Sequence, residues 1–75
     1  MRIKAELTFP IELKDEATLC YLCKKFEIVL NIIEASFSTD VGWAIVVIEG
    51  AEAETKKALE YLTGKSVEIK NTQML

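Results

Sequence analysis

The chain has 75 residues, a formal net charge of −3 and no histidine, which limits it to one small domain and removes the commonest general base and metal ligand. Its lysines and arginines form no long run, so the sequence predicts neither nucleic-acid binding nor attraction to an anionic membrane. The longest apolar run, residues 43–48, is far shorter than the ~20 residues that cross a bilayer, and charges interrupt the N-terminus, so we expect a cytoplasmic protein without membrane insertion.

The first predicted element is a strand over residues 2–9. Apolar and polar residues alternate along this segment, a period of two that is typical of a strand with one buried side. Pro10 ends the strand, because proline has no N–H to donate to a neighbouring strand. The side chains expected on the buried side are Ile3, Ala5, Leu7 and Phe9.

Residues 15–26 change to the period of a helix. Apolar residues recur there at spacings typical of one stripe of an amphipathic helix. Asp15 is the expected N-cap, and Lys24 and Lys25 lie near the C-terminal end, where positive charge interacts favourably with the helix dipole. The stripe consists of Leu19, Leu22, Cys23 and Phe26.

Residues 27–50 predict a β-hairpin with strands at 28–37 and 43–48. The turn between them contains Ser38, Thr39, Asp40 and Gly42, residue types that turns favour. Because successive side chains of a strand point to opposite faces, both faces of this hairpin are apolar. The alternating sets are Trp43, Ile45 and Val47 against Ala44, Val46 and Ile48 in the second strand, and Val29, Ile33, Ala35 and Phe37 against Ile28, Leu30 and Ile32 in the first.

A second helix and a last strand follow the hairpin. Residues 51–63 have an inner face of Ala58, Leu59 and Leu62, and Gly64 is the expected C′ residue that ends this helix. Residues 66–70 alternate around Val67 and Ile69 and predict a short strand. Residues 71–75 are expected to be a loosely held tail, so that residues 1–75 form a single domain with a core at about 2–71.

The predicted order β-α-β-β-α-β is that of an α+β ferredoxin-like sandwich. In this fold a four-stranded antiparallel sheet carries both helices on one face. The expected strand order is 4-1-3-2, so the third strand is central and the second lies at an edge. The helix-free face is then polar on the first and last strands but apolar on the hairpin.

The uncovered apolar face of the hairpin predicts a homodimer built on residues 28–48. Two helices can cover only one face of the sheet, and monomers seldom expose a contiguous apolar patch beyond about 300–600 Å². A two-fold axis would bring the same patch of both subunits together. The expected interface residues are Leu30, Ile32, Trp43, Ile45 and Val47.

Cys20 and Cys23 form a C-x-x-C pair. A zinc site needs four ligands, and the sequence has neither a third cysteine nor a histidine. Redox pairs of the thioredoxin type lie at a helix N-terminus, whereas this pair is predicted in mid-helix. We therefore expect both cysteines to be packing residues, with no metal site.

No catalytic constellation is recognisable in the sequence. The glycines Gly42, Gly50 and Gly64 mark element boundaries, so no glycine-rich phosphate loop is present. The carboxylates of residues 51–63 are expected to be a solvated helix face. We expect no catalytic residue, no cofactor and no enzymatic activity in this chain.

Asn31 is the one polar residue in the apolar run 28–33. It could mark a strand irregularity or face solvent at the sheet edge. Alternatively, its amide could serve a ligand or partner, because two donors and an acceptor suit the polar end of an amino acid. The sequence by itself leaves both interpretations open.

Several motifs, in this order along the chain, resemble the NIL domain family. They are Leu7-Thr8-Phe9-Pro10, Lys24-Lys25-Phe26, Asn31-Ile32-Ile33, Gly42 and Glu49-Gly50. The resemblance covers residues 3–70. The family's Asn-Ile-Leu segment has Ile33 in its third position here, and Ala17 or a neighbour stands where the family often has a proline.

The resemblance implies an ACT-like variant of the ferredoxin-like fold and a regulatory role. NIL domains occur at the C-terminus of methionine ABC importer ATPases, where they bind methionine and inhibit transport, and others precede ferredoxin-type iron–sulfur modules. The ligand lies beside the motif asparagine near a dimer interface, which corresponds to Asn31 here. The residues expected to line that site are Asn31, Ile32, Ile33, Phe37 and Trp43.

Two functions therefore compete at this point. The first is a homodimeric sensor of methionine or a related sulfur amino acid. The second is a protein-interaction module whose hairpin docks a ferredoxin or an ABC-transporter-related protein without binding a small molecule. A redox or metal role for Cys20 and Cys23 ranks below both.

Overall fold

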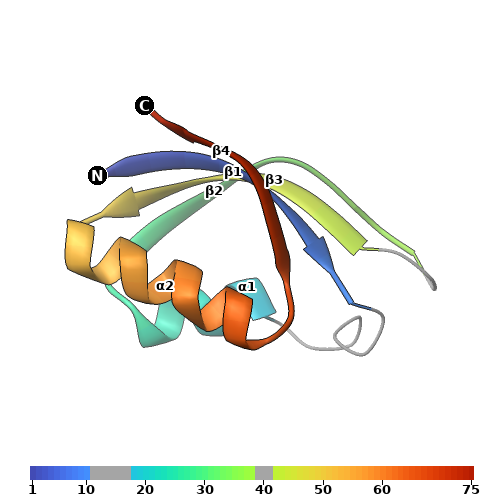
Figure 1. Ribbon diagram of the computed structural model, residues 1–75, viewed down its shortest axis with the longest axis horizontal. Coiled ribbons are helices and arrows are strands. Elements are labelled where there is room, and N and C mark those ends of the chain that lie inside the picture. Colours follow the sequence, from blue (N-terminus) through green and yellow to red (C-terminus); the bar gives the residue numbers. More distant parts are fainter. Residues whose placement is uncertain (11–17, 39–41) are drawn as a thin grey trace.

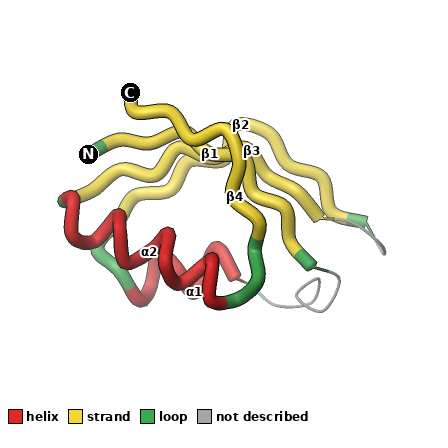
Figure 2. The backbone as a smooth tube through the Cα atoms, viewed as in Figure 1, coloured by secondary structure: helices red, strands yellow, loops and turns green. Residues whose placement is uncertain are grey.

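The computed structural model describes residues 1–10, 18–38 and 42–75. Its strands form one antiparallel sheet in the order β2-β3-β1-β4, and both helices lie against one face of it (Figure 1 and Figure 2). The predicted α+β architecture, element order and strand order are confirmed. The elements are β1 (Arg2–Phe9), α1 (Thr18–Lys25), β2 (Ile28–Phe37), β3 (Gly42–Gly50), α2 (Glu52–Gly64) and β4 (Glu68–Met74).

The pairing of β1 with β3 forms the centre of the sheet. Along β1 buried residues alternate strictly with more exposed ones, as the sequence period predicts. Directly opposite residues of antiparallel strands point to the same face, so the buried pairs make a continuous apolar floor. These pairs are Ile3 with Ile48, Ala5 with Val46 and Leu7 with Ala44.

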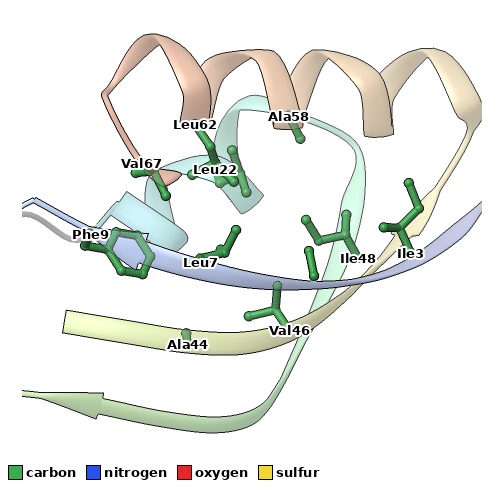
Figure 3. Close-up of a cluster of buried hydrophobic side chains, with 11 residues drawn as sticks. Ile3, Leu7, Phe9, Leu22, Ala44, Val46, Ile48, Ala58, Leu62 and Val67 are labelled. Carbon is green, nitrogen blue, oxygen red and sulfur yellow. The ribbon is translucent and has the colours of Figure 1, made fainter. Parts of the chain in front are cut away.

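The core lies between this floor and the helices (Figure 3). α1 contributes Leu22, and α2 contributes Ala58 and Leu62, all without solvent exposure. Truncating a fully buried leucine such as Leu22 or Leu62 typically costs about 2–5 kcal/mol, because a cavity remains. The other members of the core cluster are Ile3, Ala5, Leu7, Phe9, Ala44, Val46, Ile48 and Val67.

α1 rests on the sheet through a narrow side. Thr18 and Leu22 are buried, and Leu19 and Phe26 are partly buried against the core. The expected N-cap, Asp15, lies outside the described residues. The apolar stripe predicted for this helix is therefore confirmed at three of its four positions, Leu19, Leu22 and Phe26.

The cysteines are the exception. Cys20 and Cys23 are both exposed, so the prediction that they are packing residues is wrong. Cys23 is rotated by about 100° from Leu22 around the helix axis, and the buried sector of α1 is too narrow to include it. Cys20 is the third residue of α1 (Thr18–Lys25).

α2 ends in a Schellman motif centred on Ser66, whose φ of 66° is left-handed. The Val67 N–H donates to the Leu62 carbonyl at 3.0 Å, and the Ser66 N–H donates to the Thr63 carbonyl at 3.0 Å, the two bonds that define this motif. The prediction that Gly64 is the C′ residue is wrong, because the helix continues through it and the left-handed position falls two residues later.

β4 occupies most of the predicted tail. The strand extends to Met74, so the expectation that residues 71–75 are loosely held is wrong. The pairing register of β4 with β1 shifts between Lys4 and Glu6, where β4 has one residue more than β1. Asn71 takes up the extra residue with a left-handed φ of 51°, a conformation that asparagine tolerates, and its Nδ2 donates to Glu6 Oε2.

Glu54 of α2 holds the start of β2 in place. The N–H of Glu27, the residue before β2, donates to Glu54 Oε1 at 2.9 Å, and Lys57 Nζ lies 3.5 Å from Glu54 Oε2. The backbone hydrogen bond from Glu27, aided by the Lys57 charge and opposed by desolvation, holds the pKa of the Glu54 carboxyl below its ordinary value of 4.5.

Replacing Ser66 with glycine should stabilise the protein. A left-handed conformation costs an ordinary residue roughly 1–2 kcal/mol, and glycine avoids most of that cost. The greater entropy of glycine in the unfolded chain offsets part of this gain. We expect Ser66→Gly to raise the free energy of unfolding by about 1 kcal/mol in urea titrations. The matched control is Lys65→Gly, where φ is −90° and glycine relieves no strain. Equal stability of the two variants would contradict this account of the helix end.

Glu54→Gln should remove a pH-dependent part of the stability. Because the folded-state pKa is lowered, the carboxylate stabilises the fold above the unfolded pKa of about 4.5, and that contribution is lost as the pH falls through the folded value. Wild type should therefore exceed Glu54→Gln in stability at neutral pH, and the difference should shrink in acid. Thermal unfolding between neutral and acidic pH measures it, with Glu60→Gln, an exposed residue of the same helix, as the control. A difference that does not vary with pH would count against the bond to Glu27.

Candidate functional site

Strand β2 is an exposed, apolar sheet edge. It pairs with β3 on one side, and every residue from Asn31 to Phe37 is exposed. Val29 is 68% exposed, Ile33 54% and Phe37 56%. An edge strand presents N–H and C=O groups along its free side, and a long apolar edge is a template for another strand. β2 is therefore the strongest candidate for a functional surface.

A bulge at Ile33 divides β2 into two parts. Ile32 and Glu34 lie opposite the adjacent residues Val46 and Ile45 of β3, which leaves Ile33 as the extra residue. Because a shift of one residue reverses the faces, the residues beyond the bulge lie on the opposite face from that predicted by simple alternation. The predicted grouping of Val29, Ile33, Ala35 and Phe37 on one face is therefore wrong.

The register of β2 with β3 assigns each side chain to a face. Leu30 lies opposite Ile48 and Ile32 opposite Val46, whose side chains are in the core. The predicted grouping of Leu30 and Ile32 with Trp43, Ile45 and Val47 on the uncovered face is therefore wrong. The pairing register of the hairpin places Leu30 and Ile32 on the face that the helices cover. The residues of β2 on the helix-free, open face are Val29, Asn31, Glu34 and Ser36.

The open face of β3 is less bare than the sequence predicts. Val47 is only 7% exposed, and Trp43 and Ile45 are partly buried. Val47 lies between Lys4 of β1 and Asn31 of β2, and the aliphatic stem of a lysine can cover apolar neighbours. The large exposed apolar side chains of the hairpin consequently belong to β2.

Phe37 packs at the end of the sheet. Its ring centroid lies 5.6 Å from that of Phe9 with a tilt of 47°, a favourable arrangement for two aromatic rings. Both residues lie opposite Gly42, where an added Cβ would come within 2.7 Å of Phe37 Cδ1. The glycine therefore allows the rings to meet above the strand, while much of Phe37 still faces solvent.

The five residues predicted to line a ligand site do not form one cluster within the chain. Asn31 and Trp43 lie on the open face, Ile32 and Phe37 on the core face, and Ile33 at the bulge. Val47, the residue of β3 opposite Asn31, is four residues from Trp43. Asn31 and Trp43 are therefore about 13 Å apart along the strand direction. The ligand-binding roles of these five residues remain predictions.

Two neighbours of Asn31 are missing from the prediction. Val29 precedes it by two residues on the same face, and Glu34 follows it on that face beyond the bulge. The period of a strand was a sufficient signal for Val29, since residues i and i−2 share a face. Glu34 could not be found in this way, because the bulge alters the parity.

The polar groups on the open face of β2 are an amide, a carboxylate and a hydroxyl, from Asn31, Glu34 and Ser36. The amide and the carboxylate can bind the charged ends of a small zwitterion. In the three described ranges, no group of three or more His, Cys, Asp or Glu side chains could hold a metal ion. No helix in this part of the chain is long and apolar enough to cross a membrane.

The chain is similar to a known family and to known structures. A family model described as "NIL domain" matches residues 4–71. The C-terminal domain of an ABC transporter ATP-binding protein from Enterococcus faecalis has a TM-score of 0.75 and 18% sequence identity, covering 89% of this chain and 79% of that chain. The de novo designed protein Ferredog-Diesel has a TM-score of 0.58 and 16% identity, covering 99% and 85%. At these identities the structural likeness shows the fold alone. No curated protein sequence matches the chain.

Proposed function

This chain belongs to the NIL domain family, and on that premise we propose that it is a regulatory domain that binds methionine or a related sulfur amino acid as a homodimer in the cytoplasm. The role is one of binding, without catalysis or a cofactor. A fold shared with the C-terminal domain of an ABC transporter ATP-binding protein supports a regulatory part in a transporter context. The observation that carries the proposal is the exposed edge of β2, where an amide lies among apolar side chains.

The dimer forms through β2 edges that pair in antiparallel fashion about a two-fold axis. Such pairing joins two sheets into one and satisfies the free N–H and C=O groups of both edges. Its apolar contacts come from Val29, Ile32 and Ile33, each exposed in the single chain. Glu34 is the one charged residue of β2, so repulsion between like charges is small. The interface thus centres on the strand edge, with Trp43, Ile45 and Val47 on the adjoining open face.

The ligand site lies beside Asn31 at this edge. The Asn31 amide donates to the carboxylate of the amino acid, and Glu34, on the same face across the bulge, accepts hydrogen bonds from its ammonium group. The apolar side chain packs against Val29 and against residues of the second copy. A single chain supplies only half of such a pocket, which couples ligand binding to dimerisation.

The alternative function uses the same edge differently. An extended segment of a ferredoxin or an ABC-transporter-related protein could add to β2 as an extra strand, with pockets for alternate side chains. A small ligand that binds the native state raises the melting temperature, whereas a pure interaction module does not respond to it. Thermal unfolding with a panel of amino acids therefore separates the two functions.

Ile33→Lys should dissociate the dimer. Burying this side chain contributes roughly 1.5–3 kcal/mol for each copy, so its loss from both copies should weaken the dimer about a hundredfold or more. Sedimentation velocity at tens of micromolar measures the effect. Met74→Lys provides the control, since Met74 is a comparably exposed residue on the opposite edge strand β4. A monomeric wild type, or equal dissociation of both variants, would refute the β2 interface.

Asn31→Ala should weaken amino-acid binding. The amide is proposed to bond a charged group, and losing such a bond costs about 1.5–3 kcal/mol, a roughly tenfold to hundredfold rise in Kd. Isothermal titration calorimetry with methionine measures it. Ser36→Ala removes a polar group from the same face of the same strand and should leave Kd almost unchanged. If both variants bind methionine like the wild type, Asn31 is not part of the site.

A further inference from the structure

The outer side of α1 carries two exposed thiols that the proposed function does not use. Thr18 and Leu22 direct the opposite side of this helix into the core, whereas Cys20 and Cys23 are both exposed. Free cysteine is usually among the most buried residue types, where it acts as a small apolar side chain. Two solvent-facing cysteines on one short helix therefore have no packing explanation.

The spacing of the pair places both thiols on the same side of the helix. Residues three apart are separated by about 60° around the axis, and their Cβ atoms are about 5–6 Å apart. Cys20 and Cys23 thus form a dithiol on one side of the helix. Lys24, four residues after Cys20, adds positive charge to the same side.

This spacing suits a bridging ion better than a direct sulfur–sulfur bond. A disulfide needs Cβ atoms about 3.5–4.5 Å apart, so the helix would have to distort to form one. An ion bound to both sulfurs at about 2.3 Å, the length of a zinc–thiolate bond, allows the sulfurs to be as much as ~4.6 Å apart. The undistorted helix can meet that separation by side-chain rotation alone.

The number of ligands decides which ion fits. Structural zinc takes four ligands and iron–sulfur clusters take four cysteines, whereas this pair itself supplies two thiolates. Thiolates are soft ligands that select copper(I), and copper(I) is stable with two of them. We propose that Cys20 and Cys23 form a two-thiolate site on α1 that binds one copper(I) ion. Binding converts two thiols and Cu⁺ into an anionic bis-thiolate complex and releases two protons, and Lys24 offsets its negative charge.

Anaerobic titration of the reduced full chain with copper(I), against a colorimetric copper(I) chelator, tests the proposal. We expect the chain to bind one ion, and the bound ion to protect both thiols from a thiol reagent. Cys20→Ser and Cys23→Ser should each weaken binding about a hundredfold or more, because the second thiolate binds intramolecularly. The double variant Tyr21→Cys, Cys23→Ser keeps two thiols at adjacent positions, which do not face each other on a helix. It should bind as weakly as the single variants.

Two results would overturn the proposal. The first is that the wild type takes no copper(I) from the chelator under conditions in which a simple dithiol does. The second is that the Tyr21→Cys, Cys23→Ser variant takes up as much copper(I) as the wild type. The serine variants alter exposed positions and should retain the wild-type circular dichroism spectrum. Methionine binding by the same samples reports the proposed function separately, so failure of one site is distinguishable from failure of the other.

Discussion

The burial of one face of β1 and β3 beneath the two helices is the constraint on which the rest of the structure depends. β3 is paired on both sides, and its core-facing residues Ala44, Val46 and Ile48 have no solvent exposure. β2 packs against the core near its start, where Ile28 and Leu30 are partly buried, and the residues beyond Leu30 are exposed. With apolar material sufficient for one small core, the chain leaves its most apolar edge strand uncovered.

The bulge at Ile33 gives this edge its chemical character. A regular strand would place Phe37 on the open face, away from Phe9, and Glu34 on the core face. With one extra residue, Phe37 instead joins Phe9 across Gly42, and Glu34 shares the open face with Asn31. A single backbone irregularity therefore both anchors the far end of β2 and brings an amide and a carboxylate to the same surface.

The two surfaces proposed to bind ligands belong to different layers of the sandwich. The β2 edge lies in the sheet, whereas the thiol pair lies on the side of α1 that faces away from the core. Leu22 and its neighbours in the core keep the two layers in fixed relation. Occupancy of one surface can thus be altered without removing contacts from the other, which makes separate tests of the two proposals possible.

Sequence periodicity by itself determined the order of elements and most of the core, because β1, α1, α2 and the hairpin each bury a side that appears as a period of 2 or 3.6 residues. The strand order followed from the ferredoxin-like fold that this element order indicates. The sequence pattern also singled out Asn31, a polar residue in an apolar run. The tertiary structure decided the bulge at Ile33, since register depends on the partner strand, and hence the neighbours of Asn31. It also decided the exposure of Cys23, which depends on how wide a sector of α1 meets the sheet. The strand through Met74 has no buried alternation to reveal it, and forms because the edge of β1 offers non-local hydrogen-bonding partners that no local pattern encodes.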